Sequence, residues 1–147
     1  MKGDVEVFKV IWKAGDDDLR DAHEIRKMVF IEEQNVPEEV ERDKLDVSST
    51  HIIFYNDDVP IATGRIIFRG DSCSLGRIAV IKEYRGKDIG KMLVENLVKK
   101  SFELGAHEIH IHAQKHAERF YERLNFTPYG ELFYEGGITH VSMVLRK

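Results

Sequence analysis

The sequence predicts a mixed α/β protein with one central sheet. Seven short runs rich in β-branched and aromatic residues are separated by turn-prone links, which is the pattern of strands. From Ile89 to Leu104 apolar residues recur at helical spacing, and Gly105 follows where a left-handed residue commonly ends a helix. The 147 residues suit one domain, 1–147, and 42% apolar residues supply its core. We therefore expect about seven strands flanked by about four helices.

The first two elements are a strand and a helix. The run from Val5 to Trp12 predicts a strand that ends in the turn-prone segment 14–18. A helix follows, and Asp17 or Asp18 can accept the free N–H groups of its first turn. Its apolar residues share one face at Leu19, Ala22, Ile25 and Val29.

The segment 32–46 is acidic. Its seven carboxylates outnumber Arg42 and Lys44, which gives a local charge of −5. Because Pro37 blocks a continuous helix, we expect a loop with a short helix.

The remaining elements alternate strands and helices. Short links predict a meander of three strands, over 51–55, 61–69 and 74–81. After the helix at 89–104, we expect a strand at 108–113, a helix at 118–124 ended by Asn125, and strands at 127–134 and 139–145.

Composition and charge exclude several classes of protein. The net charge is −4, so there is no basic excess of the kind that nucleic-acid binding requires. The N-terminal residues contain no apolar targeting segment, and no run approaches the roughly 18 apolar residues of a membrane span. We expect a cytoplasmic protein with neither nucleic acid nor membrane as a partner.

The segment from Arg85 to Lys91 is a candidate anion site. It joins a buried-type strand to the helix at 89–104, and the first turn of a helix offers unpaired N–H groups. Between residues 82 and 100 six basic residues face three acidic ones, a local charge of +3. The spacing of Gly86 and Gly90 fits neither the Walker loop nor the dinucleotide fingerprint. The alternative is a glycine turn that only ends one element and begins the next.

A family resemblance narrows the choice of anion. The run 85–90 (Arg-Gly-Lys-Asp-Ile-Gly) resembles the pyrophosphate loop of the GNAT acyl-CoA N-acetyltransferases, Arg/Gln-x-x-Gly-x-Gly/Ala, and 117–126 resembles their Ala-x-x-x-Tyr-Glu-Lys-x-Gly-Phe helix. The runs 30–37, 112–114 and 130–140 are similar to a bacterial subgroup of the ElaA and YjcF type. The resemblance spans essentially the whole chain and implies a GNAT-type fold. Two positions depart from the pattern, because Asp88 and Asn125 stand where the family has glycine.

The resemblance implies a set of residues that bind acetyl-CoA as co-substrate. The backbone of Ile78, Ala79 and Val80 would contact the pantetheine arm. The other expected contacts are Arg85, Gly86, Lys87, Asp88, Ile89, Gly90, Lys91, Gln114, Ala117, Phe120 and Arg123.

Acetyl transfer needs a proton donor for the thiolate and a base for the amine. By resemblance Tyr121 is the general acid, and a phenol is protonated at neutral pH as this role requires. The base stays open among Glu33, His112, Glu135 and His140. Expected on the substrate side are Arg26, Gln34, His51, Glu135 and His140. His110, His112 and His116 imitate a metal cluster, but no paired Cys or Glu completes it, so we expect no metal.

The sequence thus predicts an N-acetyltransferase that moves acetyl from acetyl-CoA directly to a primary amine, of a small molecule or a peptide. The alternatives are a non-catalytic acyl-CoA sensor or interaction module and a histidine-based metal hydrolase. The charge of segment 32–46 favours a cationic acceptor, unless this run is only a solvated loop. The family also allows a homodimer through exposed strands.

Overall fold

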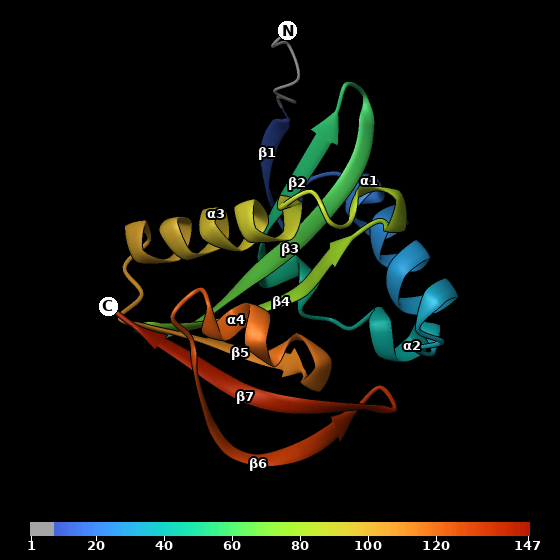
Figure 1. Ribbon diagram of the computed structural model, residues 1–147. Coiled ribbons are helices and arrows are strands. Elements are labelled where there is room, and N and C mark those ends of the chain that lie inside the picture. The colour runs from blue at the N-terminus through green and yellow to red at the C-terminus, as the bar shows by residue number, and fades with distance from the viewer. Residues whose placement is uncertain (1–7) are drawn as a thin grey trace, which may run out of the picture.

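The computed structural model describes residues 8–147 and confirms the mixed α/β fold. One seven-stranded sheet has the order β1-β2-β3-β4-β5-β7-β6 (Figure 1). The strands are β1 (Lys9–Ala14), β2 (Thr50–Asn56), β3 (Val59–Arg69), β4 (Ser72–Val80), β5 (Glu108–Gln114), β6 (Thr127–Glu135) and β7 (Ile138–Arg146). The α-helices are α1 (Arg20–Arg26), α2 (Glu38–Glu41), α3 (Ile89–Glu103) and α4 (Glu118–Glu122). The predicted start of the first strand, residues 5–7, lies outside the described range.

The first helix runs further than its sequence pattern predicts, because it changes type. The N-cap residue is Leu19, and Asp18 just before it accepts the Arg20 N–H at 3.0 Å, so Asp18 satisfies one N–H of the first turn as expected. After α1 the chain continues as a π-helix, Lys27–Glu33, with the wider bond from Gln34 N–H to Val29 O at 3.2 Å. The start of the predicted acidic loop is therefore helical. Glu33 and Gln34 consequently end a helix instead of lying within a loop.

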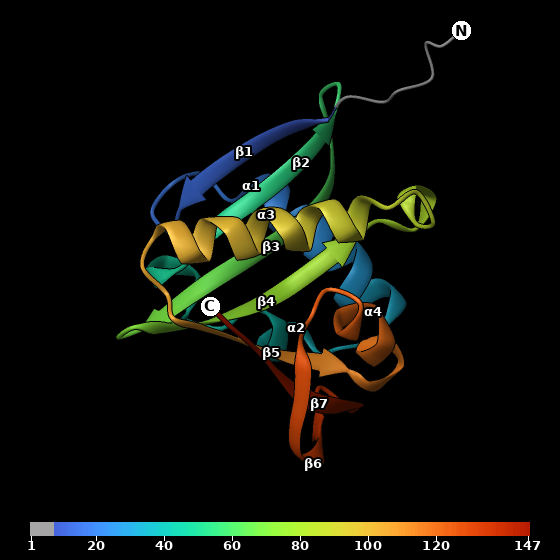
Figure 2. The same cartoon turned by 60° about the vertical axis from the view of Figure 1, so that its left-hand side comes forward.

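Two helices cover opposite faces of the sheet. Figures 1 and 2 show α3 across one face of β2, β3 and β4, with α1 behind the other. The buried residues of α3 include Ile89, Leu93 and Leu97, and those of α1 include Ala22 and Ile25. The apolar periodicity in the sequence marks these buried faces correctly. Within residues 8–147 no helix is both long and apolar enough to span a bilayer.

The sheet separates between β4 and β5, its one parallel pair. The two strands are paired only from Ser72 with Glu108 to Leu75 with Ile111. Beyond that point β4 stays paired with β3, while β5 stays paired with β7. A β-bulge shifts the β3–β4 register after Thr63, opposite Arg77, whose φ is +52°. The two halves of the sheet therefore diverge and leave an opening beside the second half of β4.

Candidate functional site

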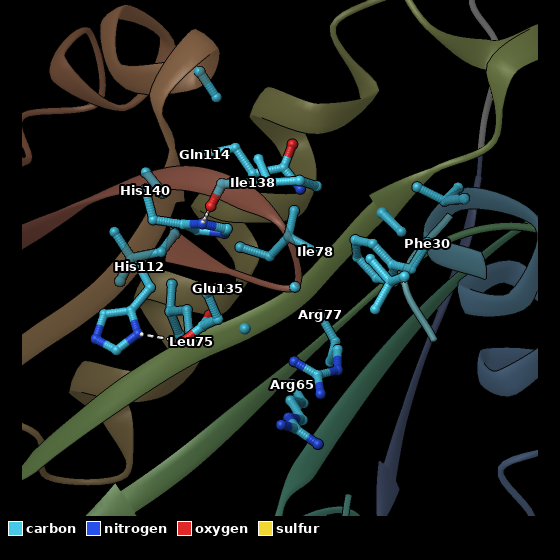
Figure 3. A pocket seen from close by; sticks show the side chains of 18 of the residues that line it. Phe30, Arg65, Leu75, Arg77, Ile78, His112, Gln114, Glu135, Ile138 and His140 are labelled. Atoms are coloured by element: carbon cyan, nitrogen blue, oxygen red, sulfur yellow. Dashed lines mark hydrogen bonds and ion pairs between the residues drawn. The ribbon is translucent and has the colours of Figure 1, made fainter. Parts of the chain in front are cut away.

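A cavity of about 780 Å³ fills the opening between β4 and β5. Its walls come from the π-helix and the loop after it, from β3 and β4, from the start of α3, from β5 and α4, and from the β6–β7 turn. Figure 3 shows labelled side chains of the π-helix and of β3, β4, β5, β6 and β7 around the cavity. This is the volume of a typical ligand site.

Most of the sequence-predicted site residues lie on this cavity. Those that line it are Gln34, Ile78, Ala79, Val80, Arg85, Gly90, His112, Gln114, Ala117, Phe120, Tyr121, Glu135 and His140. Those that do not line it are Arg26, Glu33, His51, Gly86, Lys87, Asp88, Ile89, Lys91 and Arg123. Five of these residues lie between or next to Arg85 and Gly90, which do line the cavity: Gly86, Lys87, Asp88, Ile89 and Lys91.

The start of α3 brings backbone close to the cavity. Gly86 has φ +78° and Asp88 has φ +62°, so Asp88 adopts the left-handed conformation that makes glycine favourable at this position. The Asp88 side chain is exposed. A Cβ on Gly90 would stand 3.6 Å from Phe120 Cζ, so a longer side chain there would enter the space between α3 and α4.

Arg85 and Glu33 form an ion pair at the mouth. Arg85 Nη1 donates to Glu33 Oε2 at 2.9 Å and Nη2 donates to Oε1 at 2.7 Å. Arg85 Nε also donates to Val80 O at 2.9 Å. Glu33 therefore occupies the fork of an arginine that lines the cavity, a pairing that sequence positions 52 residues apart do not reveal.

An amide pair crosses the opening. Gln114 Nε2 donates to Gln34 Oε1 at 2.9 Å, and Gln34 Nε2 donates back to Gln114 Oε1 at 3.3 Å. Next to it, the ideal Cβ position of Gly136 lies 3.5 Å from Val36 Cγ2, so the β6–β7 turn packs on the loop after the π-helix. These contacts join the end of the π-helix and the loop after it to β5 and the β6–β7 turn.

Tyr121 lines the cavity from α4. It is buried, and its ring packs edge-to-face on Phe120 and Phe126 at centroid distances of 4.9 and 5.9 Å. Burial raises the pKa of the Tyr121 hydroxyl. The group is a protonated phenol across the physiological range, as a proton donor must be.

Three titratable side chains, one each on β5, β6 and β7, line the same side of the cavity. His112 Nδ1 lies 3.4 Å from Glu135 Oε2. This pairing raises the pKa of His112 and lowers that of Glu135. His140 is 7% exposed, and its Nδ1 lies 2.7 Å from Ile138 O (Figure 3).

Arginines from α1 and β3 bind the acidic segment through a buried ion-pair network. Arg26 is 1% exposed, and it donates through Nε to Glu41 Oε2 at 2.6 Å and through Nη1 to Asp46 Oδ1 at 2.8 Å. Arg65 Nη1 donates to Asp46 Oδ1 at 2.8 Å. The same side chain donates to both carboxylate oxygens of Asp43, at 2.8 and 2.7 Å.

Arg77 completes this network from β4. Its Nε lies 3.2 Å from Glu41 Oε2, and its Nη2 donates to Asp43 Oδ2 at 3.0 Å and to Val40 O at 3.2 Å. Arg77 is also the left-handed residue of the β4 bulge. The network therefore fixes the acidic loop and the bulged strand to each other.

The network changes the interpretation of the acidic segment. Glu41, Asp43 and Asp46 are neutralised by guanidinium groups, so the local charge of −5 is not a free field at the cavity. Burial alone would raise the pKa of Asp46, but hydrogen bonds and charges from Arg26 outweigh it and hold that pKa well below its usual value. Arg26 is not a substrate contact here, because it is committed to this network.

His51 has a structural partner of its own. Its Nε2 lies 3.0 Å from Asp46 O, and the side chain is buried on β2 away from the cavity. A carbonyl oxygen only accepts, so the ring donates to it. His51 therefore supports the acidic segment and does not reach the substrate side.

The three clustered histidines have separate partners. His110 Nε2 lies 3.0 Å from Glu108 Oε1, and its Nδ1 lies 2.9 Å from Tyr129 Oη. His116 Nε2 lies 2.7 Å from Gln114 Oε1, and His112 faces Glu135. Among residues 8–147 no group of three His, Cys, Asp or Glu side chains is arranged to hold a metal ion.

The sequence analysis missed Arg65 and Arg77, both of which line the cavity. The sequence does contain a signal for these two arginines. Each arginine lies in a run with strand character and a largely apolar composition, where a charged side chain needs an ionic partner. The acidic segment is the source of those partners.

The chain is similar to known proteins over most of its length. A family profile described as an acetyltransferase (GNAT) domain matches residues 17–147. The chain is 33% identical over 138 residues to the N-acetyltransferase YjcF of Bacillus subtilis, covering 93% of this chain and 99% of that protein. It is 30% identical over 129 residues to ElaA of Escherichia coli, covering 82% of each.

Solved structures share the fold. The crystal structure of Escherichia coli ElaA has a TM-score of 0.86 at 24% identity, covering 96% of this chain and 100% of that one. A GNAT family acetyltransferase from Elizabethkingia anophelis, solved with acetyl-CoA bound, has a TM-score of 0.72 at 11% identity, covering 95% and 98%.

If the buried ion-pair network stabilises the fold, removing one of its arginines should lower the stability much more than removing an exposed arginine. Arg26→Met should lower the free energy of unfolding by about 3–5 kcal/mol, because Glu41 and Asp46 would lose a buried partner. Arg20→Met on the same helix is the matched control, since Arg20 pairs only with the exposed Asp18. Urea unfolding measures both. An equal and small effect of the two substitutions would contradict the structural role of the network.

Proposed function

This chain belongs to the GNAT acetyltransferase family, whose chemistry is acyl transfer, and we propose that it moves an acetyl group from acetyl-CoA directly to a primary amine. One observation carries the proposal. The unpaired edge of β4, the start of α3 and the Tyr121 hydroxyl all border one cavity. Acetyl-CoA is a long thioester with an anionic diphosphate, and binding it for acetyl transfer requires these three features together.

The residues present fit acetyl-CoA. Beyond Leu75 the β4 edge is not paired with β5, so the backbone groups of 78–80 that face away from β3 are available to amides of the pantetheine arm, except Val80 O, which accepts from Arg85 Nε. The first turn of α3 offers N–H groups to the diphosphate, with Arg85 beside it. The Elizabethkingia anophelis protein, which shares this fold, was solved with acetyl-CoA bound, and this supports acetyl-CoA as the donor in the proposal.

Tyr121 supplies the proton in the proposed reaction. The acceptor nitrogen bonds to the carbonyl carbon while the carbon–sulfur bond breaks, and Tyr121 protonates the leaving thiolate. Burial keeps the phenol neutral until that moment, because the phenolate would be charged in an apolar site. A backbone N–H near Val80 would polarise the carbonyl oxygen. No covalent enzyme intermediate is needed.

The acceptor is a primary amine of a small molecule or a peptide, held on the β5–β7 side of the cavity. Gln34, Glu135 and His140 offer polar contacts there. Arg26 and His51 are no longer part of this proposal, because both are bound into the network behind the cavity.

The direct test is acetyl-CoA turnover, measured as free thiol, across a panel of primary amines. Release of thiol that depends on the amine, with the N-acetyl product identified by mass spectrometry, is the expected result. Tight acetyl-CoA binding without turnover on any amine would favour the alternative, a non-catalytic acyl-CoA sensor with the same fold.

The donor site predicts a steep dependence on side-chain size at residue 90. Gly90→Glu should abolish acetyl-CoA binding, because the new side chain would place a carboxylate between Phe120 and the diphosphate position. Gly90→Ala should weaken binding far less, since its Cβ has only ordinary contacts. Calorimetry compares the two folded variants. Unchanged affinity in Gly90→Glu would remove this segment from the donor site.

The acid role predicts a loss confined to the chemical step. Tyr121→Phe should lower kcat by about 10²–10⁴-fold and leave acetyl-CoA affinity nearly intact, because the hydroxyl matters only as the sulfur leaves. Single-turnover rates and calorimetry separate the two effects. A variant with the wild-type single-turnover rate would exclude Tyr121 as the acid.

In the free protein the Glu33 carboxylate is bound to Arg85, so we expect it to compete with the diphosphate of acetyl-CoA for this arginine. Glu33→Gln should tighten acetyl-CoA binding by about two- to fivefold, the scale of a partly exposed ion pair. Glu32→Gln, which removes an exposed carboxylate one residue earlier, is the control for general charge. S-acetyl-pantetheine, which lacks the diphosphate, should bind equally to the wild type, Glu33→Gln and Glu32→Gln. Identical acetyl-CoA affinities for the two variants would contradict the competition.

A further inference from the structure

The sequence leaves four candidates for the base, and the structure commits three of them to other partners. Glu33 is held in the fork of Arg85 and does not line the cavity. His112 and Glu135 face each other at 3.4 Å. That pairing lowers the proton affinity of the carboxylate and places His112 Nδ1 against it. Glu33 and Glu135 would have to break an ion pair before accepting a proton from a substrate, and the Glu135 contact raises the pKa of His112 and so favours its protonated form.

His140 differs from these three groups because its tautomer is fixed. Nδ1 lies 2.7 Å from Ile138 O, and a carbonyl oxygen only accepts, so Nδ1 carries the proton in the neutral ring. The Nε2 lone pair is then free, and among residues 8–147 it has no hydrogen-bond partner. Phe133 stacks on the ring at a centroid distance of 5.7 Å and an interplanar angle of 26°. The ring is thus held in one orientation on the cavity wall.

The surroundings of His140 place it with the reacting groups. Its strand β7 pairs it with Gln114 of β5, which closes the opening through Gln34. The other charged and titratable residues that line the same cavity are Glu41, Asp43, Arg65, Arg69, Arg77, Arg85, His112, His116, Tyr121 and Glu135. Tyr121 on α4 and His140 on β7 therefore line one cavity from different elements.

We propose that His140 is the general base of the transfer, and that Nε2 takes the proton of the acceptor amine. This rests on the proposed function. The nitrogen–carbon bond forms, one N–H proton passes to Nε2, the carbon–sulfur bond breaks, and Tyr121 protonates the sulfur. The imidazolium then returns its proton through solvent to the tyrosinate, which restores both groups. The Ile138 carbonyl stabilises the imidazolium, because Nδ1–H donates to it throughout.

His140→Asn tests this assignment with little change to the fold. The asparagine amide can keep the hydrogen bond to Ile138 O while the nitrogen at the Nε2 position is lost. Its single-turnover rate should fall by about 10²–10⁴-fold with an amine accepted by the wild type. A base must be unprotonated to act, so the variant should lose the fall in rate that the wild type shows on the acidic side of its pH profile. His110→Asn, outside the cavity, should leave both quantities unchanged.

Hydrolysis of acetyl-CoA without an amine gives a second rate that does not depend on the acceptor. This rate should also be lower in His140→Asn, because a base that deprotonates an amine also activates water. The ¹⁵N spectrum of labelled histidines adds a readout without turnover, and it should show His140 protonated at Nδ1 and bare at Nε2. An Nε2-protonated tautomer would overturn the proposal. So would a slow His140→Asn variant whose pH profile keeps the wild-type shape, which would indicate a structural role. A wild-type protein that binds no acetyl-CoA would instead refute the proposed function.

Discussion

The separation of β4 from β5 is the constraint on which the rest of the structure depends. Parallel strands in a sheet satisfy their backbone groups through each other, and here that pairing stops at Leu75 and Ile111. The cavity exists because the strands diverge beyond that point. The polar backbone of the second half of β4 then faces a ligand space, and α3, α4 and the β6–β7 turn converge on its rim.

Such an opening needs support, and two sets of contacts provide it. On one side, Arg77 holds the bulged part of β4 to the acidic segment, and Arg65 and Arg26 hold that segment to β3 and α1. Across the cavity, a reciprocal amide pair joins Gln34, at the end of the π-helix, to Gln114 of β5. Charges that the composition suggests are free for a substrate are instead used to keep the cavity wall in place, because buried charges persist only when paired.

Local patterns in the sequence predict the elements well and their long-range partners poorly. The period of α3 and the links of the meander follow from neighbouring residues, so both could be read directly. Asp88 illustrates the limit: the sequence shows a departure from glycine, and only the backbone angle shows that aspartate adopts the same left-handed conformation. The Glu33–Arg85 pair and the roles of Arg26 and His51 depend on which strands become neighbours. Composition carries no information of that kind, so it does not reveal that Glu41, Asp43 and Asp46 of the acidic segment are paired with arginines.

In the proposed reaction the donor, the acid and the base meet in this one cavity. A crystal structure of the protein with bound CoA would locate the CoA sulfur. We expect the diphosphate on the first turn of α3, the pantetheine arm along the edge of β4, and the sulfur within hydrogen-bonding distance of Tyr121 Oη, on the same side of the cavity as His140. A diphosphate bound elsewhere, or a sulfur out of reach of Tyr121, would contradict this proposal.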